Sequence, residues 1–396
     1  MTSRKKGSAE NRHPATAILH DGRDPAGQHG FVNSPTYRGS TVLFPTLDAL
    51  EAYDEQPYRY GRPGTPTTAA LEDAITRLEG GARTLLTASG YQAVTTAILA
   101  FVKAGDHVLM VDSVYQPTRK FCDTILARLG VATTYYDPLA GAGISDLIQD
   151  NTRVVFLESP GSLTFEVQDV GAIAKAARAR DAAVLMDNTW ATGLYFRPLA
   201  HGVDVSINAC TKYIVGHADA MLGAITANAR TAKLVEEARA TLGGCPGSEE
   251  TYLGLRGLRT LAVRLERHQR SALEVARWLS GRPEVERILH PALPTDPGHA
   301  LWKAQYTGAS GLFSVILKPA PRKALAAMLD GLELFGMGYS WGGYESLIVP
   351  FNPKRYRTAT AWTAAGPALR LHIGLDDPRD LIADLDAGLA RLRIVA

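Results

Sequence analysis

Apolar runs alternate with amphipathic stretches through the middle of the chain, from about residue 68 onward. The runs 107–112 (HVLMVD), 153–158 (RVVFLE) and 182–187 (AAVLMD) are apolar almost throughout. Strands of this kind are typical of a mostly parallel sheet that is covered by helices on both faces. We therefore expect an α/β fold here. Strands are expected at 107–112, 131–136, 153–158, 182–187, 203–209 and 221–227, and helices at 117–129 and 169–180.

The last third of the chain has a different pattern. Residues 249–280 predict one or two long helices. The final helix is well marked, because Asp377 is a candidate N-cap, Pro378 stands at the first helical position, and leucines recur every four residues after it. These elements predict a smaller C-terminal α/β domain. Its strands are expected at 311–318, 346–350 and 368–375.

The first 62 residues are rich in Gly, Pro, Ser and Arg and show little sustained periodicity. Residues 57–66 (PYRYGRPGTP) must be largely irregular, because three prolines and two glycines break any regular element. We interpret this region as an arm that ends in an ordered loop. The expected organisation is an arm (1–62), a large domain (63–258) and a C-terminal domain (259–396).

Composition narrows the class of protein. Of the 396 residues 46% are hydrophobic, and the net charge is +2 without a long basic stripe, so we expect no nucleic-acid partner. The one basic cluster, Arg4 to Lys6, is interpreted as a solvated terminus. No apolar run reaches the roughly 20 residues of a membrane span, and the N-terminus lacks the apolar core of a signal peptide. We expect no membrane partner and a cytoplasmic location.

Cysteine and histidine usage argues against a metal site. Cys122, Cys210 and Cys245 are far apart and odd in number, which is typical of a reduced, cytoplasmic protein without a disulfide framework. The ten histidines contain no HExxH motif. We therefore predict no metal ligands.

Lys212 is the first candidate for chemistry. It closes the segment 206–212 (SINACTK), where its neighbours are apolar or small, and lysine is rarely buried without a partner. A buried lysine has a lowered pKa and can attack carbonyl groups. The alternative is a lysine at a strand end that extends to solvent, and this segment alone leaves both possibilities open.

Two other candidates follow predicted strands. Asp187 ends the strand 182–187, and ligand sites in parallel sheets lie beyond the carboxyl ends of the strands. A carboxylate there could hold a protonated pyridine nitrogen, or simply form a turn or a helix N-cap. Tyr115 follows the strand 107–112, where it could stack on a flat ring or be an ordinary half-buried loop tyrosine.

Further signals concern anion binding. Gly90 and Tyr91 lie in a turn before a helix, whose free N–H groups suit a phosphate, although many such turns bind nothing. Because successive side chains of a strand point to opposite faces, Arg370 lies on the other face from Leu369 and Leu371. There it either binds a carboxylate or faces solvent. The glycine-rich stretch 336–345 indicates backbone approaching a ligand, or a mobile loop.

These motifs, in this order, resemble the Cys/Met-metabolism family of pyridoxal-phosphate (PLP) enzymes, and within it the bacterial β-lyases most of all. The resemblance runs from about residue 16 to the C-terminus. It is carried by the stretches 78–81 (LEGG), 104–110 (AGDHVLM), 156–162 (FLESPGS), 187–191 (DNTWA), 204–207 (DVSI), 211–217 (TKYIVGH), 339–347 (YSWGGYESL) and 370–375 (RLHIGL).

The resemblance implies a large domain of the aspartate-aminotransferase type and PLP as cofactor. Lys212 matches the lysine that carries PLP as a Schiff base, Asp187 the partner of the pyridinium nitrogen, and Tyr115 the tyrosine that stacks on the ring. Gly90 and Tyr91 match the phosphate-binding turn. Thr211 matches a phosphate-binding hydroxyl.

The resemblance also implies an oligomer and a place for the substrate. Tyr60 and Arg62 match a pair that reaches the phosphate from the neighbouring subunit, with Tyr60 also beside the substrate. A homodimer would then be the minimal unit, and tetramers are usual in the family. Arg370 and the Ser340–Trp341 backbone match the site for the substrate α-carboxylate.

A few positions bear on the reaction. Ala209 stands where many relatives carry a phosphate-binding serine. The resemblance favours β- over γ-elimination, because relatives that act at the γ-carbon commonly have leucine in place of Trp341 and often lack a counterpart of Tyr344. Gln116 stands where methionine γ-lyases tend to have cysteine. We therefore expect β-elimination from L-cystathionine within methionine biosynthesis, with cystine and cysteine as further substrates. The alternatives are a γ-eliminating or γ-replacing enzyme of the same family and a non-catalytic PLP-binding protein.

Overall fold

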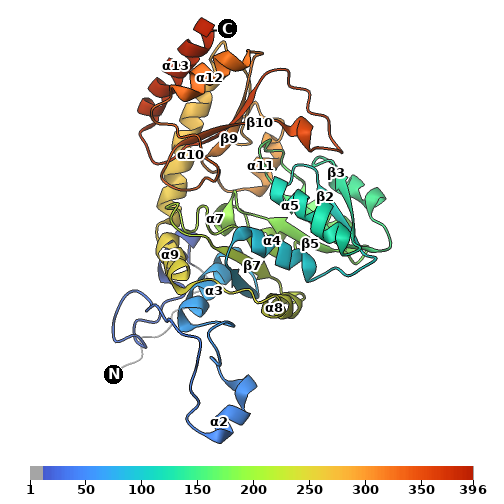
Figure 1. The fold of residues 1–396 in the computed structure, drawn as a ribbon, viewed down its shortest axis with the longest axis vertical. Helices are drawn as coiled ribbons and strands as arrows, with labels where there is room; N and C mark the ends of the chain where they lie inside the picture. Colours follow the sequence, from blue (N-terminus) through green and yellow to red (C-terminus); the bar gives the residue numbers. More distant parts are fainter. Residues whose placement is uncertain (1–11, 396) are drawn as a thin grey trace.

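The computed structural model describes residues 12–395, so the basic cluster at Arg4 to Lys6 lies outside the described part. This part contains a seven-stranded sheet in the order β1-β7-β6-β5-β4-β2-β3 and a four-stranded sheet in the order β10-β11-β9-β8 (Figure 1). The first sheet is formed by β1 (Arg83–Thr87), β2 (His107–Val111), β3 (Ala132–Tyr136), β4 (Thr152–Glu158), β5 (Ala183–Asp187), β6 (Val205–Asn208) and β7 (Gly223–Ala227). The second is formed by β8 (Val285–Leu289), β9 (Leu312–Leu317), β10 (Leu347–Phe351) and β11 (Ala368–His372).

The large sheet is mostly parallel, as expected from its apolar strands. β7 runs antiparallel to its neighbours β1 and β6, and the other pairings are parallel. Both faces are buried: in β1, Leu85 lies in one core cluster and the adjacent Leu86 in another. The surrounding helices are α3 (Pro66–Glu79), α4 (Gly90–Leu99), α5 (Gln116–Phe121), α6 (Val170–Arg178), α7 (Thr192–Tyr195), α8 (Ala232–Thr241) and α9 (Ser248–Leu258).

The helix α10 (Leu261–Ser280) links the two sheets, as the long helix running upward in Figure 1. Leu265 packs in the core beside α3, whereas Ala272 and Val275 pack in the core of the small sheet. The small sheet is antiparallel and carries α11 (His299–Gln305), α12 (Arg322–Asp330) and α13 (Pro378–Val395). α13 begins at Pro378 as predicted, and Leu381 and Leu389 are fully buried in the core of the small domain.

Some elements differ from the predicted ones. The segment 117–129, predicted as one helix, is α5 followed by a π-helical turn at Cys122–Leu126. α1 (Pro14–His20) and α2 (Leu47–Glu51) lie in the expected arm and were not predicted, because five to seven residues are too few to show a helical period. The strand β1 was also not predicted.

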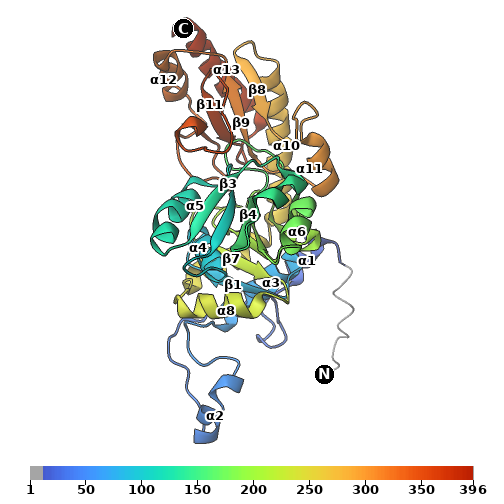
Figure 2. The same cartoon turned by 90° about the vertical axis from the view of Figure 1, so that its right-hand side faces the viewer.

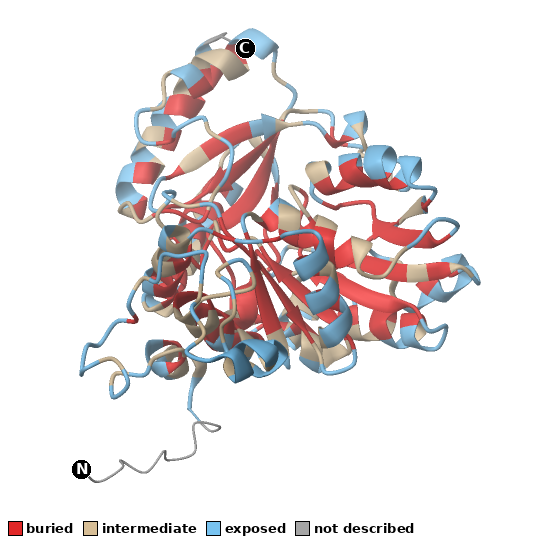
Figure 3. Cartoon of the chain, turned by 60° about the horizontal axis from the view of Figure 1, so that its bottom comes forward, coloured by how far each residue is buried: buried red, intermediate tan, exposed pale blue. Residues whose placement is uncertain are grey.

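The arm around α2 projects away from the body of the molecule (Figures 1 and 2). It carries apolar side chains on its surface: Leu43 is 87% exposed, Leu47 66% and Leu50 48%. Elsewhere the buried residues concentrate in the strands and the helix faces that pack on them (Figure 3). The arm around α2 therefore presents apolar side chains that its own chain does not cover.

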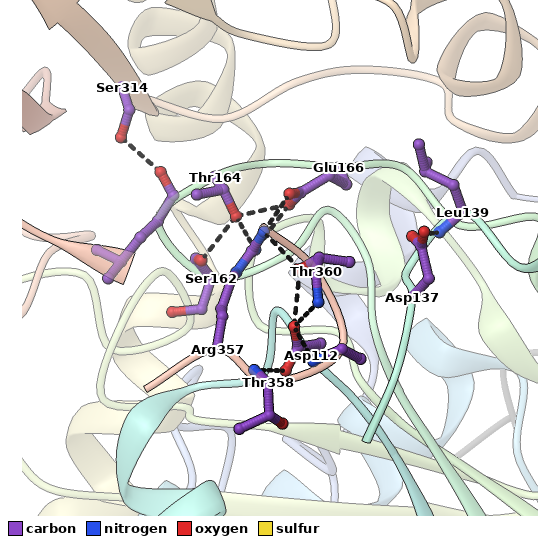
Figure 4. Close-up of polar contacts among 12 residues, drawn as sticks. Asp112, Asp137, Leu139, Ser162, Thr164, Glu166, Ser314, Arg357, Thr358 and Thr360 are labelled. Carbon is purple, nitrogen blue, oxygen red and sulfur yellow. Dashed lines mark hydrogen bonds and ion pairs between the residues drawn. The ribbon is translucent and has the colours of Figure 1, made fainter. Parts of the chain in front are cut away.

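A buried polar cluster ties the small domain to the large one (Figure 4). Asp112, which follows β2, accepts hydrogen bonds from the backbone N–H groups of Thr358, at 3.1 Å, and Thr360, at 2.8 Å, and pairs with Arg119. Arg357, on the same connection between β10 and β11, pairs with Glu166 of the large domain at 2.7 Å. These bonds fix the connection against the end of β2.

The pKa of Asp112 lies below its usual value. Burial opposes ionisation, but the hydrogen bonds from Thr360 and Thr358 and the pairing with Arg119 outweigh burial. A carboxyl group with a lowered pKa stabilises the fold above its unfolded-state pKa of about 4, and that stabilisation is lost as the pH falls through the folded-state value. The domain contact should therefore weaken in acid.

We predict that Asp112→Ala lowers the free energy of unfolding by about 3 kcal/mol or more, because it leaves Arg119 buried without its partner. Asp137→Ala is the matched control: Asp137 is exposed and accepts from the N–H of Leu139 at 2.8 Å. Urea denaturation of both variants at neutral and acid pH measures the effect. The difference from wild type should shrink in acid for Asp112→Ala, and equal losses in the two variants at neutral pH would contradict the assignment.

Candidate active site

Four parallel strands end side by side at one edge of the large sheet, in the spatial order β6, β5, β4, β2. Lys212 lies just beyond β6, Asp187 ends β5, Glu158 ends β4, and Tyr115 lies just beyond β2. The carboxyl ends of parallel strands are where ligand sites form in open α/β sheets. The structure thus brings the predicted residues Lys212, Asp187 and Tyr115 to one edge, and adds Glu158 to them.

Lys212 is half-buried, and its amine is held by the small domain. Nζ donates to Oγ of Ser340 at 2.6 Å and lies 5.4 Å from the ring centroid of Trp341. Burial and the positive charge of Arg370 lower the pKa of Lys212 to about 8, although Asp187 opposes this shift. About one amine in ten is then neutral at pH 7, against far fewer for a free lysine. Lys212 can therefore act as a nucleophile and as a base.

Asp187 is connected to the segment before Lys212 by Thr189. Oδ1 of Asp187 accepts from the N–H of Thr189 at 2.9 Å and from its hydroxyl at 2.6 Å. Oγ1 of Thr189 in turn accepts from the N–H of Ala209 at 2.9 Å. Burial raises the pKa of Asp187, while the Thr189 hydrogen bonds and Lys212 oppose the rise. Among the described residues none hydrogen-bonds to Oδ2, so this oxygen can accept from a ligand.

Arg370 lies on β11, and only 8% of it is exposed, which excludes the alternative of a solvated face. Nη2 donates to the carbonyl oxygen of Ser340 at 3.0 Å, whereas the buried Nε finds no partner among the described residues. Burial lowers the pKa of Arg370 to about 10, so it stays charged at neutral pH. A buried guanidinium with a free N–H is suited to binding a carboxylate.

The glycine-rich stretch owes its composition to a close approach of two backbones. Gly342 has φ +89°, and a Cβ there would lie 2.8 Å from the backbone carbon of Lys212. Ser340 also has a positive φ, of 83°, which is strained for a residue with a side chain. The backbone of this loop therefore approaches Lys212 closely, and the loop holds Ser340 against the amine.

The predicted anion-binding turn starts α4. Gly90 is the first helical residue, Ser89 caps the helix by accepting from the N–H of Gln92, and a Cβ at Gly90 would lie 2.4 Å from Cβ of Ala209. The N–H groups of this first turn have no partner within the helix, which suits an anion. Tyr91 beside it is 43% exposed.

The hydroxyl group of Thr211 already forms hydrogen bonds within its own chain. It donates to the carbonyl oxygen of Leu222 at 3.1 Å and accepts from the N–H of Leu222 at 2.9 Å. It can accept one more hydrogen bond but would have to rotate to donate to a phosphate. The expected role of Thr211 as a phosphate-binding hydroxyl therefore stays a prediction.

Tyr60 and Arg62 are not brought to the strand ends by their own chain. Arg62 donates to the carbonyl oxygen of Ala240 on α8 at 2.9 Å, and Tyr60 forms an isolated β-bridge with Thr41. Tyr60 is 43% exposed, on the arm that projects from the body. Neither residue hydrogen-bonds to Lys212 within residues 12–395, and the expectation that they act on a neighbouring subunit stays a prediction.

Two residues of the site were not predicted from the sequence. Glu158 accepts from the N–H of Tyr115 through Oε2 at 2.7 Å, and Thr189 connects Asp187 to Ala209. Glu158 ends a predicted strand in the same way as Asp187 does, so the strand-end signal could have found it. Thr189 carries no such signal, because its role depends on the pairing of β5 with β6.

The arrangement offers five chemical functions around one sheet edge. A partly neutral amine can bind a carbonyl carbon covalently, and a buried carboxylate can hold a protonated ring nitrogen. A buried guanidinium can bind a carboxylate, and the N-terminal turn of a helix can bind a phosphate. The ring of Tyr115, which is 48% exposed at the same edge, can cover a flat ligand.

Comparisons with known proteins agree with this geometry. The chain is 47% identical to the cystathionine β-lyase MetC of Escherichia coli, over 95% of this chain and 98% of that one. It is 42% identical to an L-alanine/L-glutamate racemase of Wolbachia pipientis, over 95% and 96% of the two chains. The crystal structure of metB from Corynebacterium glutamicum superposes with a TM-score of 0.91 at 29% identity, covering 98% of this chain and 100% of that one. Residues 15–390 match the family described as Cys/Met metabolism PLP-dependent enzyme, and the chain belongs to that family.

Proposed function

We propose that this protein is a PLP-dependent carbon–sulfur lyase that cleaves L-cystathionine at the β-carbon, giving homocysteine, pyruvate and ammonia. The observation that carries the proposal is the grouping of Lys212, Asp187 and the buried Arg370 around one sheet edge. The 47% identity to a cystathionine β-lyase over nearly the whole chain supports the choice of substrate. The MetC and racemase relatives are more similar to this chain than the γ-synthase of Mycobacterium bovis, which is 34% identical.

The residues present fit PLP. Gly90 packs closely against Ala209, and the N–H groups in the first turn of α4 have no partner within the helix, which suits a phosphate. Lys212 has an amine with a pKa of about 8 for the covalent link, and Oδ2 of Asp187 is free to hold the pyridinium proton. Ala209 provides no hydroxyl, so we expect the helix turn, and Arg62 of a neighbouring subunit, to bind most of the phosphate charge.

The chain's own side chains would divide the work as follows. When bound, PLP supplies an electrophilic carbonyl and a ring that stores the electron pair released at the substrate α-carbon. Arg370 binds the substrate α-carboxylate and so fixes the α-carbon near Lys212. Lys212, held by Ser340, takes the α-proton on Nζ. Loss of that proton and departure of sulfur from the β-carbon release homocysteine, and water converts the three-carbon remainder into pyruvate and ammonia.

Trp341 forms an apolar wall beside the amine of Lys212. Its ring lies 5.3 Å, centroid to centroid, from the ring of the buried Tyr213. An apolar wall of this kind desolvates the amine and keeps part of it neutral.

The cytoplasmic location expected from the free cysteines is part of this proposal. Within the described residues no helix is long and apolar enough to cross a membrane.

A product assay tests the proposed reaction. We predict pyruvate and homocysteine from L-cystathionine, with slower pyruvate release from cystine. Formation of 2-oxobutyrate from cystathionine or methionine would contradict β-elimination and indicate γ-chemistry. Conversion of L-alanine to D-alanine, without pyruvate from cystathionine, would instead assign the activity of the racemase relative.

Two variants test the assigned side chains. Lys212→Ala should abolish turnover, because the covalent anchor and the base are lost together, while PLP can still bind through its phosphate. Asp187→Asn should fold and bind PLP but lose most activity, since an amide cannot hold the pyridinium proton electrostatically. Pyruvate formation is measured with cofactor content as the control. A near-normal rate in either variant would refute the role given to that residue.

We also propose that each active site is built from two subunits of a homodimer, which can pair into a tetramer. In this arrangement Tyr60 and Arg62 reach the phosphate of the neighbouring subunit, with Tyr60 also beside the substrate. The arm that carries them leaves Leu43 and Leu47 exposed at 87% and 66%, and a second copy would cover this apolar surface. Arg62→Ala removes a charge-assisted contact of about 1.5–3 kcal/mol, so PLP affinity should fall by roughly one to two decades.

Mixed dimers separate the two possible positions of Arg62. Lys212→Ala and Arg62→Ala damage different halves of a shared site, so co-assembly should regenerate one intact site in each mixed dimer. We predict recovered pyruvate formation in the mixture at limiting PLP, absent from either parent. No recovery despite demonstrated subunit exchange would place Arg62 in the site of its own chain and refute the shared site.

A further inference from the structure

Glu158 and Asp187 form a pair of carboxyl groups at the sheet edge. They are register partners at the ends of the parallel strands β4 and β5, so their side chains leave the sheet on the same face. Asp187 has an assigned task, whereas Glu158 has none in the proposed mechanism. Within the part of the chain that the structure describes, the one hydrogen bond that its carboxyl group accepts comes from the backbone N–H of Tyr115, at 2.7 Å to Oε2.

The surroundings of the two carboxyl groups differ. Asp187 accepts two hydrogen bonds from Thr189 and is favoured as an anion by Lys212. The titratable groups that face Glu158 are Asp187, from β5, and Tyr115, from the turn after β2, and no cation among the described residues pairs with it. Burial and then the charge of Asp187 raise the pKa of Glu158 well above its usual value. Like charges this close separate into one ionised and one neutral group.

We propose that Glu158 is a positioning residue that works in its protonated form, holding the backbone N–H of Tyr115 and leaving Asp187 as the single negative charge at this edge of the sheet. The neutral carboxyl group keeps an oxygen for Tyr115, so the turn that carries the tyrosine ring stays fixed. A second anion beside Asp187 would compete for the pyridinium proton. The inference rests on the proposed function only where turnover is measured.

Two substitutions separate a neutral carboxyl group from a charged one. Glu158→Gln keeps the shape, the neutral charge and an acceptor for the N–H of Tyr115. Glu158→Leu keeps much of the volume but removes the acceptor. If Glu158 is protonated, Glu158→Gln should retain kcat/KM within about threefold, and the absorption of the bound cofactor should titrate at the same pH as in wild type. Glu158→Leu should lose roughly 10- to 100-fold in kcat, the cost of a displaced group at a reacting site.

Infrared difference spectroscopy reads the protonation state without turnover. The spectrum of wild type minus Glu158→Gln, at neutral pH and with PLP bound, should contain the carbonyl band of a protonated carboxyl group. The other buried glutamates, Glu72 and Glu79, occur in both proteins and cancel. Asp187→Asn is the contrasting variant, since its difference spectrum should contain carboxylate bands instead.

Carboxylate bands in the Glu158→Gln difference spectrum would overturn the inference, whatever reaction the enzyme catalyses. So would a Glu158→Gln variant whose cofactor titration moves or whose kcat falls as far as that of Glu158→Leu, because a charge would then be required. Unchanged kcat in a folded Glu158→Leu variant would refute the positioning role. If Glu158→Leu fails to fold, judged by circular dichroism, the spectrum and rate of Glu158→Gln still decide.

Discussion

The parallel pairing of β6, β5, β4 and β2 determines where the chemistry can occur. Because these strands run in one direction, their carboxyl ends place four residues side by side along a single edge: Lys212, Asp187, Glu158 and Tyr115. In the chain, 97 positions separate Tyr115 from Lys212. The strands are buried on both faces, which fixes their register. The site thus depends on a core whose own residues take no part in the reaction.

The small domain completes the site from the other side. It contributes Arg370 from β11 and the Ser340–Trp341 loop, which reach Lys212 through one hydrogen bond and the close packing of Gly342. The hydrogen bonds from Thr358 and Thr360 to Asp112 hold the connection between β10 and β11 on the large domain, and so does the Arg357–Glu166 pair. Burial then sets the charge states: it lowers the pKa of Lys212 and Arg370 and raises that of Asp187 and Glu158.

The sequence predicted what depends on local pattern and on motifs. Strand ends at Asp187 and near Lys212 follow from apolar runs, and the α13 start follows from Pro378. The burial of Arg370 could not be predicted, because it depends on how β11 packs between β9 and β10. The pairing of Glu158 with Asp187 required the β4–β5 register, and the engagement of Thr211 by Leu222 required the contact between two chain segments. The proposed contact of Tyr60 and Arg62 with the phosphate depends on a second chain.

The covalent attachment of PLP at Lys212 is the central claim, and peptide mapping tests it most directly. The holoenzyme is reduced with borohydride, which makes the link permanent, and the digested protein is analysed by mass spectrometry. The account predicts a single phosphopyridoxyl-modified peptide that contains the segment 211–217, with the modification on Lys212. Modification of another lysine, or none in a protein that binds PLP and turns over substrate, would contradict it.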